Sequence, residues 1–261
     1  MNKLNIFNRK NWFLKGIILV IISFSLIGKP EKTHQLDNIE ELISQHNNDE
    51  YIILLHGMFR SAFAMKPAEI FLKEKGFNIV NMSYPSTQYD IETLVAEHLR
   101  PLVLSLEQQG VKKIHFVTHS MGGILVRQYL KNYPMPYLGR VVMLSPPNKG
   151  TELTNIFSDT QWFKDNIGPA GTQLNPHSTS WVNQLGDVNF ELGIIAGNYN
   201  GNWLTAWLLP GADDGVVSVD SMKVTGMTDF LLVSEKHFNL RRLIPALQQA
   251  VYFIENGQFY Q

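Results

Sequence analysis

Residues 51–145 alternate between short apolar runs and longer stretches in which apolar residues recur at helical spacing. The run at 51–55 is unbroken, and shorter apolar runs lie within 77–82, 113–119 and 140–145, several of them rich in β-branched residues. Unbroken apolar strands are typical of parallel sheets that are covered on both faces. The stretches between them predict helices at 61–75, 90–109 and 121–133, with Ser61 and Asp90 as caps of the first two and a kink at Pro101 in the second. The pattern therefore predicts an α/β fold with a mostly parallel central sheet, helices on both faces and right-handed crossovers.

The second half of the chain contains two further predicted strands, at 191–197 and 229–233, and a closing helix at 243–256. Pro245 in the first turn and Gly257 just past the end suit that helix. Residues 146–187 lack long periodic segments and are rich in Asn, Thr, Gly, Pro and scattered aromatic residues. A stretch of this kind inside a compact domain is usually functional. We expect a small lid or cap insertion at about 150–188, the alternative being an insertion without function.

The N-terminus predicts a targeting segment at residues 1–30. Basic residues precede an apolar stretch at 16–28, and no acidic residue occurs before Glu31. This order is typical of an export signal. The apolar stretch is shorter than the roughly 20 residues of a spanning helix, yet a cleavage site appears only weakly, at Ser23-Phe24-Ser25. We expect an exported protein, periplasmic or membrane-anchored or secreted, with an uncleaved membrane anchor as the alternative to a cleaved signal.

Composition narrows the classes of function. The chain has 261 residues, of which 44% are hydrophobic and 17% charged, enough for one large domain at 31–261 with a full core. A net charge of −1 without a basic stripe argues against a nucleic-acid partner. The absence of cysteine excludes disulfides, thiolate catalysis and cysteine metal sites.

The segment around Ser120 carries the strongest chemical signal. An apolar strand at 113–119 ends at this serine, and Gly122-Gly123 and a helical pattern follow at once. A serine on a sharp strand-to-helix turn presents its hydroxyl above the strand ends, which is the nucleophile elbow of serine hydrolases. Thr118 stands where a glycine is usual, so the motif is T-x-S-x-G. Ser120 is our candidate nucleophile.

A serine nucleophile needs a base, and the base needs a partner that fixes its tautomer. His237 follows the last strand, where a loop returns toward Ser120, and is our candidate base. His119 flanks the serine directly and is expected to give local support. Asp214 precedes a glycine turn and is the candidate acid, with Asp213 as its rival because two adjacent side chains cannot both face His237. Three other acidic residues stay open as candidates: Asp187, Glu191 and Asp220.

The tetrahedral intermediate of acyl transfer needs N–H donors for its negative oxygen. One donor is expected from the residue after the nucleophile, Met121, and another from the loop after the first strand. There, His56-Gly57-Met58 is placed to supply the N–H of Met58, with Gly57 permitting a close turn. Arg60 either contacts an acidic group of the substrate or lies at the start of a helix without a role in binding, and the sequence leaves this open.

With these residues in place, the chain from about Tyr51 to Tyr260 resembles the α/β-hydrolase superfamily, specifically its bacterial lipase and esterase-like members. The resemblance rests on these motifs: His56-Gly57-Met58, Thr118-His119-Ser120-Met121-Gly122-Gly123, Ser145-Pro146-Pro147-Asn148-Lys149-Gly150, Gly168-Pro169-Ala170-Gly171, Asp213-Asp214-Gly215-Val216-Val217 and His237. It implies that Ser120, Asp214 and His237 act as nucleophile, acid and base, with Met58 and Met121 in the oxyanion hole. It also implies a compact variant with six strands, and no cofactor.

The leading functional hypothesis is hydrolysis of a small-molecule carboxylic ester or lipid through an acyl-enzyme. Apolar residues in and near the lid hint at an acyl pocket, although lid packing explains them equally well: Phe157, Trp162, Trp203, Trp207, Leu208 and Leu209. The segment from Trp203 to Leu209 could also insert into a membrane surface, in addition to the membrane association expected of the N-terminal segment. The alternatives are an acyltransferase on the same triad and an inactive binding protein on a hydrolase scaffold.

Overall fold

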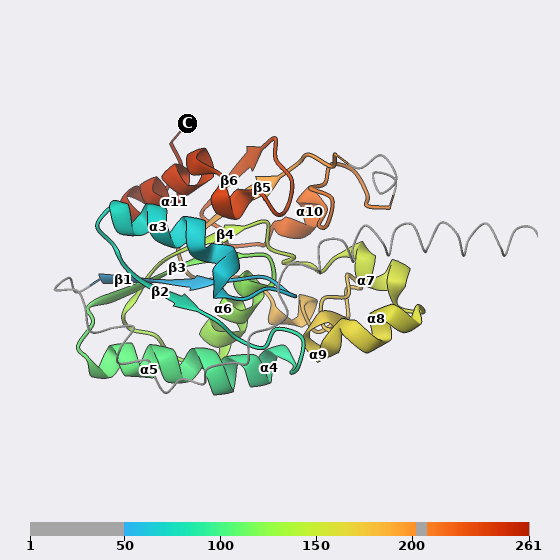
Figure 1. Ribbon diagram of the computed structural model, residues 1–261, viewed down its shortest axis with the longest axis horizontal. Helices are drawn as coiled ribbons and strands as arrows, with labels where there is room; N and C mark the ends of the chain where they lie inside the picture. The colour runs from blue at the N-terminus through green and yellow to red at the C-terminus, as the bar shows by residue number, and fades with distance from the viewer. Residues whose placement is uncertain (1–49, 202–207, 261) are drawn as a thin grey trace, which may run out of the picture.

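The computed structural model describes residues 50–201 and 208–260, apart from the side chains of residues 162 and 164. Six parallel strands form one sheet in the order β2-β1-β3-β4-β5-β6 (Figure 1). The strands are β1 (Glu50–Leu55), β2 (Asn78–Met82), β3 (Lys113–His119), β4 (Leu138–Leu144), β5 (Leu192–Gly197) and β6 (Asp229–Val233). The predicted α/β class, the parallel sheet and its six strands are confirmed.

Helices cover both faces of the sheet. On one face lie α3 (Lys66–Glu74) and α11 (Ile244–Asn256), and on the other lie α4 (Ile91–Leu94), α5 (Arg100–Gln108) and α6 (Met121–Asn132) (Figure 1). Successive side chains of β1 alternate between the two cores, with Ile52 and Leu54 on the side of α3 and α11, and Ile53 and Leu55 on the other. All four are fully buried, which explains why β1 is apolar without interruption from Tyr51 to Leu55.

The helix expected from Asp90 onward is interrupted before Pro101. Asp90 caps its start as predicted, because the side-chain Oδ1 accepts from the N–H of Thr93 at 2.8 Å. A π-helical turn, Val95–Leu99, then separates α4 from α5. Proline has no N–H to donate and its ring crowds the preceding turn, so the wider turn lets the chain continue in the same direction. Pro101 lies in the first turn of α5.

Two other helix ends differ in how well the sequence predicts them. Ser61 precedes a 3₁₀ turn, Ala62–Met65, and its side chain makes no capping hydrogen bond, so the predicted cap is wrong. The closing helix is as expected, with Pro245 in the first turn and Gly257 in the left-handed conformation at φ 76°. Glycine adopts this conformation without steric cost, which is why it ends helices.

Three short helices lie beyond the carboxyl ends of the strands (Figure 1). They are α7 (Glu152–Phe157), α8 (Gln161–Asn166) and α9 (Gly168–Thr172), and a 3₁₀ turn at Asn183–Leu185 follows. Sequence periodicity misses helices this short. Two further short elements, α10 (Val219–Met222) and the 3₁₀ turn η5 (Leu240–Arg242), flank β6 in the chain.

Some predicted features lie outside the described residues. These are the export signal or anchor at 1–30 and the apolar segment from Trp203 to Trp207. Within 50–201 and 208–260, none of the helices is both long and apolar enough to cross a bilayer.

Two adjacent glycines in the first turn of α6 give a matched stability test. A Cβ on Gly122 would lie 2.6 Å from the Leu55 carbonyl oxygen, whereas one on Gly123 would meet the Met143 Sδ at 2.8 Å. Backbone cannot move aside, but a methionine side chain can. We expect Gly122→Ala to lower the free energy of unfolding by roughly 1–3 kcal/mol more than Gly123→Ala, as measured by urea denaturation. Equal losses would contradict this packing.

Candidate active site

Ser120 lies on a sharp turn between β3 and α6. Its backbone has φ 55° and ψ −127°, outside the regions that a residue with a Cβ ordinarily occupies. The turn places a half-buried hydroxyl at the N-terminus of a helix of 12 residues. Thr118 is fully buried, and its Oγ1 has no hydrogen-bond partner within the described part of the chain. Thr118, where a glycine is usual, therefore buries a hydroxyl for which the described residues provide no hydrogen-bond partner.

The loop after β1 lies directly against this serine. β1 is between β2 and β3 in the sheet, so the order of strands reverses where the ends of β1 and β3 adjoin. Parallel sheets bind ligands at such switch points. A Cβ on Gly57 would lie 2.9 Å from the Ser120 Cβ and 3.4 Å from its Oγ. Only glycine fits here, as the sequence predicts for a close turn.

His56 and Tyr84 hold this loop from behind. Their rings stack at 4.1 Å with an interplanar angle of 10°. The His56 Nδ1 lies 2.8 Å from the Gly57 carbonyl oxygen, and the Tyr84 N–H donates to the Nε2 at 3.3 Å. The Tyr84 hydroxyl also donates to the His56 carbonyl oxygen. Complete burial lowers the pKa of His56 to about 4, so the ring is neutral with its proton on Nδ1.

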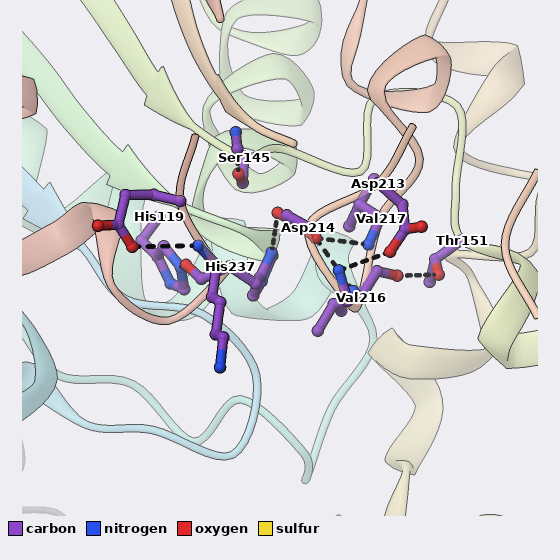
Figure 2. Close-up of polar contacts among 12 residues, drawn as sticks. His119, Ser145, Thr151, Asp213, Asp214, Val216, Val217 and His237 are labelled. Atoms are coloured by element: carbon purple, nitrogen blue, oxygen red, sulfur yellow. Dashed lines mark hydrogen bonds and ion pairs between the residues drawn. The ribbon is translucent and has the colours of Figure 1, made fainter. Parts of the chain in front are cut away.

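Asp214 contacts His237 inside the protein (Figure 2). The Asp214 Oδ2 lies 2.7 Å from the His237 Nδ1, and both side chains are almost fully buried. The other oxygen, Oδ1, accepts from the N–H groups of Val216 and Val217 at 3.0 and 2.9 Å. The His237 N–H also donates to the Asp214 carbonyl oxygen at 3.0 Å. A carboxylate held in this way fixes both the orientation and the tautomer of an imidazole.

Asp213 faces a different group. Its Oδ1 accepts from the N–H of Gly215 at 2.7 Å, and burial raises the pKa of its carboxyl. An antiparallel bridge between Asp213 and Ser218 closes the loop around Asp214. Of the two adjacent aspartates that the sequence left open, Asp214 is therefore the one against His237.

His119 supports the loop that carries His237. Its Nε2 lies 2.9 Å from the His237 carbonyl oxygen, and the two rings are 4.8 Å apart. Burial, with further repulsion from His237 and Arg241, lowers the pKa of His119 well below its ordinary value. The ring is neutral and its Nε2–H donates to that carbonyl. The local support expected of His119 thus takes the form of a hydrogen bond to the main chain.

The short helices α7 to α9 pack on the loop that carries Met58. Phe157, Phe163 and Ile167 form a small core of their own, and Met58 and Leu208 pack against it. These helices are tied to the rest of the fold through α9, where the Ala170 N–H donates to the Tyr89 carbonyl, and through Gln173 and Trp181, which donate to Glu92. Within the described ranges, no histidine or acidic side chains are grouped so as to hold a metal ion.

The sequence predicts no role for two residues at this edge of the sheet, Tyr84 and Phe238. Both have a positional signal: Tyr84 follows β2, the strand that adjoins β1, and Phe238 follows His237 directly. Residues just past the carboxyl ends of parallel strands gather at one edge, so each strand end is a place to look.

Comparisons with known proteins identify the fold. Neither family models nor curated protein sequences match the chain. Among solved structures, a mature lipase from Bacillus licheniformis matches with TM-score 0.59 and 16% identity, over 79% of this chain and 91% of that one. An esterase from Pyrococcus furiosus matches with TM-score 0.57 and 18% identity, over 80% and 82%. A phospholipase from Legionella pneumophila matches with 0.56 and 18%, over 67% of this chain and 45% of that one. The chain has the α/β-hydrolase fold of these enzymes.

The neutral state of His56 predicts that acid weakens the fold. The pKa of His56 is about 4 in the folded protein and about 6.5 in an unfolded chain, so between these values the unfolded chain binds more protons. The stabilisation is fully present above pH 6.5 and is lost as the pH falls through 4. We expect His56→Asn to flatten the pH dependence of the unfolding free energy by on the order of 3 kcal/mol, measured by urea denaturation across this range. An unchanged slope would contradict a buried neutral ring.

Proposed function

We propose that the protein is a serine hydrolase that cleaves carboxylic esters, with Ser120, His237 and Asp214 as its catalytic triad. The observation that carries the proposal is the buried Asp214–His237 pair, whose ring nitrogen and carboxylate are 2.7 Å apart. It stands beside a serine turn, because His119 contacts His237 and immediately precedes Ser120. The shared fold with lipases and esterases supports the same reading.

In this mechanism the Nε2 of His237 takes the proton of the Ser120 hydroxyl as the oxygen attacks the ester carbonyl. Asp214 stabilises the imidazolium that forms and keeps Nδ1 protonated. The N–H groups of Met58 and Met121 bind the negative carbonyl oxygen of the tetrahedral intermediate. The alcohol then leaves with the proton from His237, and water, activated by the same imidazole, hydrolyses the acyl-serine. The carboxylic acid departs, and Ser120 regains its proton.

The substrate we propose is a small ester or lipid with an apolar acyl group. Support comes from the lid, where the apolar core of Phe157, Phe163 and Ile167 packs against Met58, a proposed oxyanion residue. An acyl chain beside Met58 would meet apolar rather than charged surface. The solved structures with this fold include a lipase, an esterase and a phospholipase. The predicted targeting segment at 1–30 supports a role outside the cytoplasm, at a membrane or beyond it.

The nucleophile is tested with Ser120→Ala in the full chain. Wild type is incubated with a fluorophosphonate probe and with p-nitrophenyl esters of increasing chain length. We expect wild type to label and to release p-nitrophenol, and both to vanish in the variant, because the probe and the esters both react with the activated oxygen of Ser120. The chain-length optimum then sizes the acyl pocket.

Other outcomes of this experiment point to other functions. A wild type that is folded but neither labels nor turns over would favour a binding protein on a hydrolase scaffold. Labelling with transfer of the acyl group to added alcohols, in preference to water, would favour an acyltransferase. Labelling that persists in Ser120→Ala would place the nucleophile elsewhere.

The two aspartates provide a matched pair for the acid. We expect Asp214→Asn to lower kcat by about 10³–10⁴-fold, since an amide favours the wrong tautomer of His237. Asp213→Asn keeps an oxygen that can accept from the Gly215 N–H and removes no partner of His237, so its loss of kcat is expected to be far smaller. Both are measured with one p-nitrophenyl ester. A larger loss in Asp213→Asn would reverse the assignment.

A further inference from the structure

The ring of Phe238 lies between the catalytic base and two arginines. It meets the His237 imidazole edge-on, with centroids 5.1 Å apart and an interplanar angle of 89°. The guanidinium carbons of Arg60 and Arg241 lie 5.2 and 5.8 Å from the centroid of the same ring. Arg60 comes from the loop after β1 and Arg241 from η5, so the two loops that flank the proposed catalytic residues meet at one aromatic ring.

The charge of Arg241 lacks an acidic partner in the described part of the chain. Among the residues described, the charged groups that act on it are Arg60 and Arg242, both cations, and they add to the effect of burial in lowering the pKa of Arg241 to about 10. Its Nη1 is buried and has no hydrogen-bond partner among the described residues. The nearby acid Glu235 instead accepts from Asn239 at 2.8 Å. A buried donor on a cation that is repelled by its neighbours is unfavourable unless an anion binds there.

The position of this arginine pair relates it to one part of the substrate. In the proposed mechanism His237 hands its proton to the departing alcohol, so the alcohol portion of the ester leaves on the side of His237. Phe238 packs edge-on against that ring and holds the two guanidinium groups near it. The acyl portion is expected against the apolar lid core around Met58 instead.

We infer that Arg60 and Arg241 form a subsite for a phosphate group carried by the alcohol portion of the ester. The inference rests on the proposed function. Two guanidinium groups present several N–H donors in planar forks, which suit the several oxygens of a phosphate better than a single carboxylate does. Phe238 keeps the two cations in place through its ring face. The sequence left open whether Arg60 meets an acidic group of the substrate. In this subsite it does.

The test compares two substrates that differ only in the phosphate, dihexanoyl glycerol 3-phosphate and dihexanoylglycerol, by titration of the released fatty acid. We expect full-length wild type to prefer the phosphate ester by at least about tenfold in kcat/KM. In Arg241→Gln this ratio falls toward one, mainly through KM for the phosphate ester. In Arg241→Lys the ratio is intermediate, because a lysine keeps the charge without the fork. The exposed Arg242, whose Nη2 donates to Asn239, is the control, and Arg242→Gln keeps the wild-type ratio.

A binding measurement separates the subsite from the chemistry. Calorimetric titration of Ser120→Ala with glycerol 3-phosphate is expected to show binding that the additional change Arg241→Gln abolishes. If wild type hydrolyses neither ester, the proposed function fails and this titration alone decides the subsite. Equal kcat/KM for the two esters in wild type, or no binding of glycerol 3-phosphate, would overturn the inference. Inorganic phosphate that binds as tightly as glycerol 3-phosphate would also overturn it, by pointing to a free-phosphate site.

Discussion

The close approach of the ends of β1 and β3 is the constraint on which the rest of the site depends. Gly122 lies under the Leu55 carbonyl and Gly57 lies against Ser120, with no room for a side chain at either contact. These contacts bring the loop after β1 within reach of the serine. They also hold Ser120 in its unfavourable backbone conformation, which persists only where the surroundings leave no alternative. The sheet order, with β1 beside β3, places both loops at one edge.

Around this contact the polar groups are buried and mostly satisfied within the protein. Asp214 receives two backbone N–H groups and the ring of His237, while His56 and His119 each lie within hydrogen-bond distance of a carbonyl oxygen. Burial keeps the latter two imidazoles neutral. Fixed dipoles of this kind need no rearrangement when charge develops during a reaction. The positive charge near the site is instead carried by Arg60 and Arg241, which contact the ring of Phe238.

The fold was largely predictable because its signals are local. The buried strands carry runs of apolar residues, and Pro245 and Gly257 mark the ends of the last helix within one turn. The failures are also physical. The π turn before Pro101 is one of several ways to accommodate a proline, and the sequence does not say which one is used. Ser61 has the side chain of a cap, but a 3₁₀ turn follows it, and no capping bond forms.

The sequence by itself determined the sheet, the sharp turn at Ser120 and the choice of His237 as the candidate base, since these depend on periodicity and on residues near in the chain. For the acid it favoured Asp214 over its neighbour Asp213, with three other acidic residues still open. Only the tertiary structure decided that Asp214 faces His237, that Tyr84 stacks on His56, and that two distant arginines share one ring. The physical reason is that such contacts depend on the direction of side chains and on how segments far apart in sequence meet in space, which no local pattern encodes.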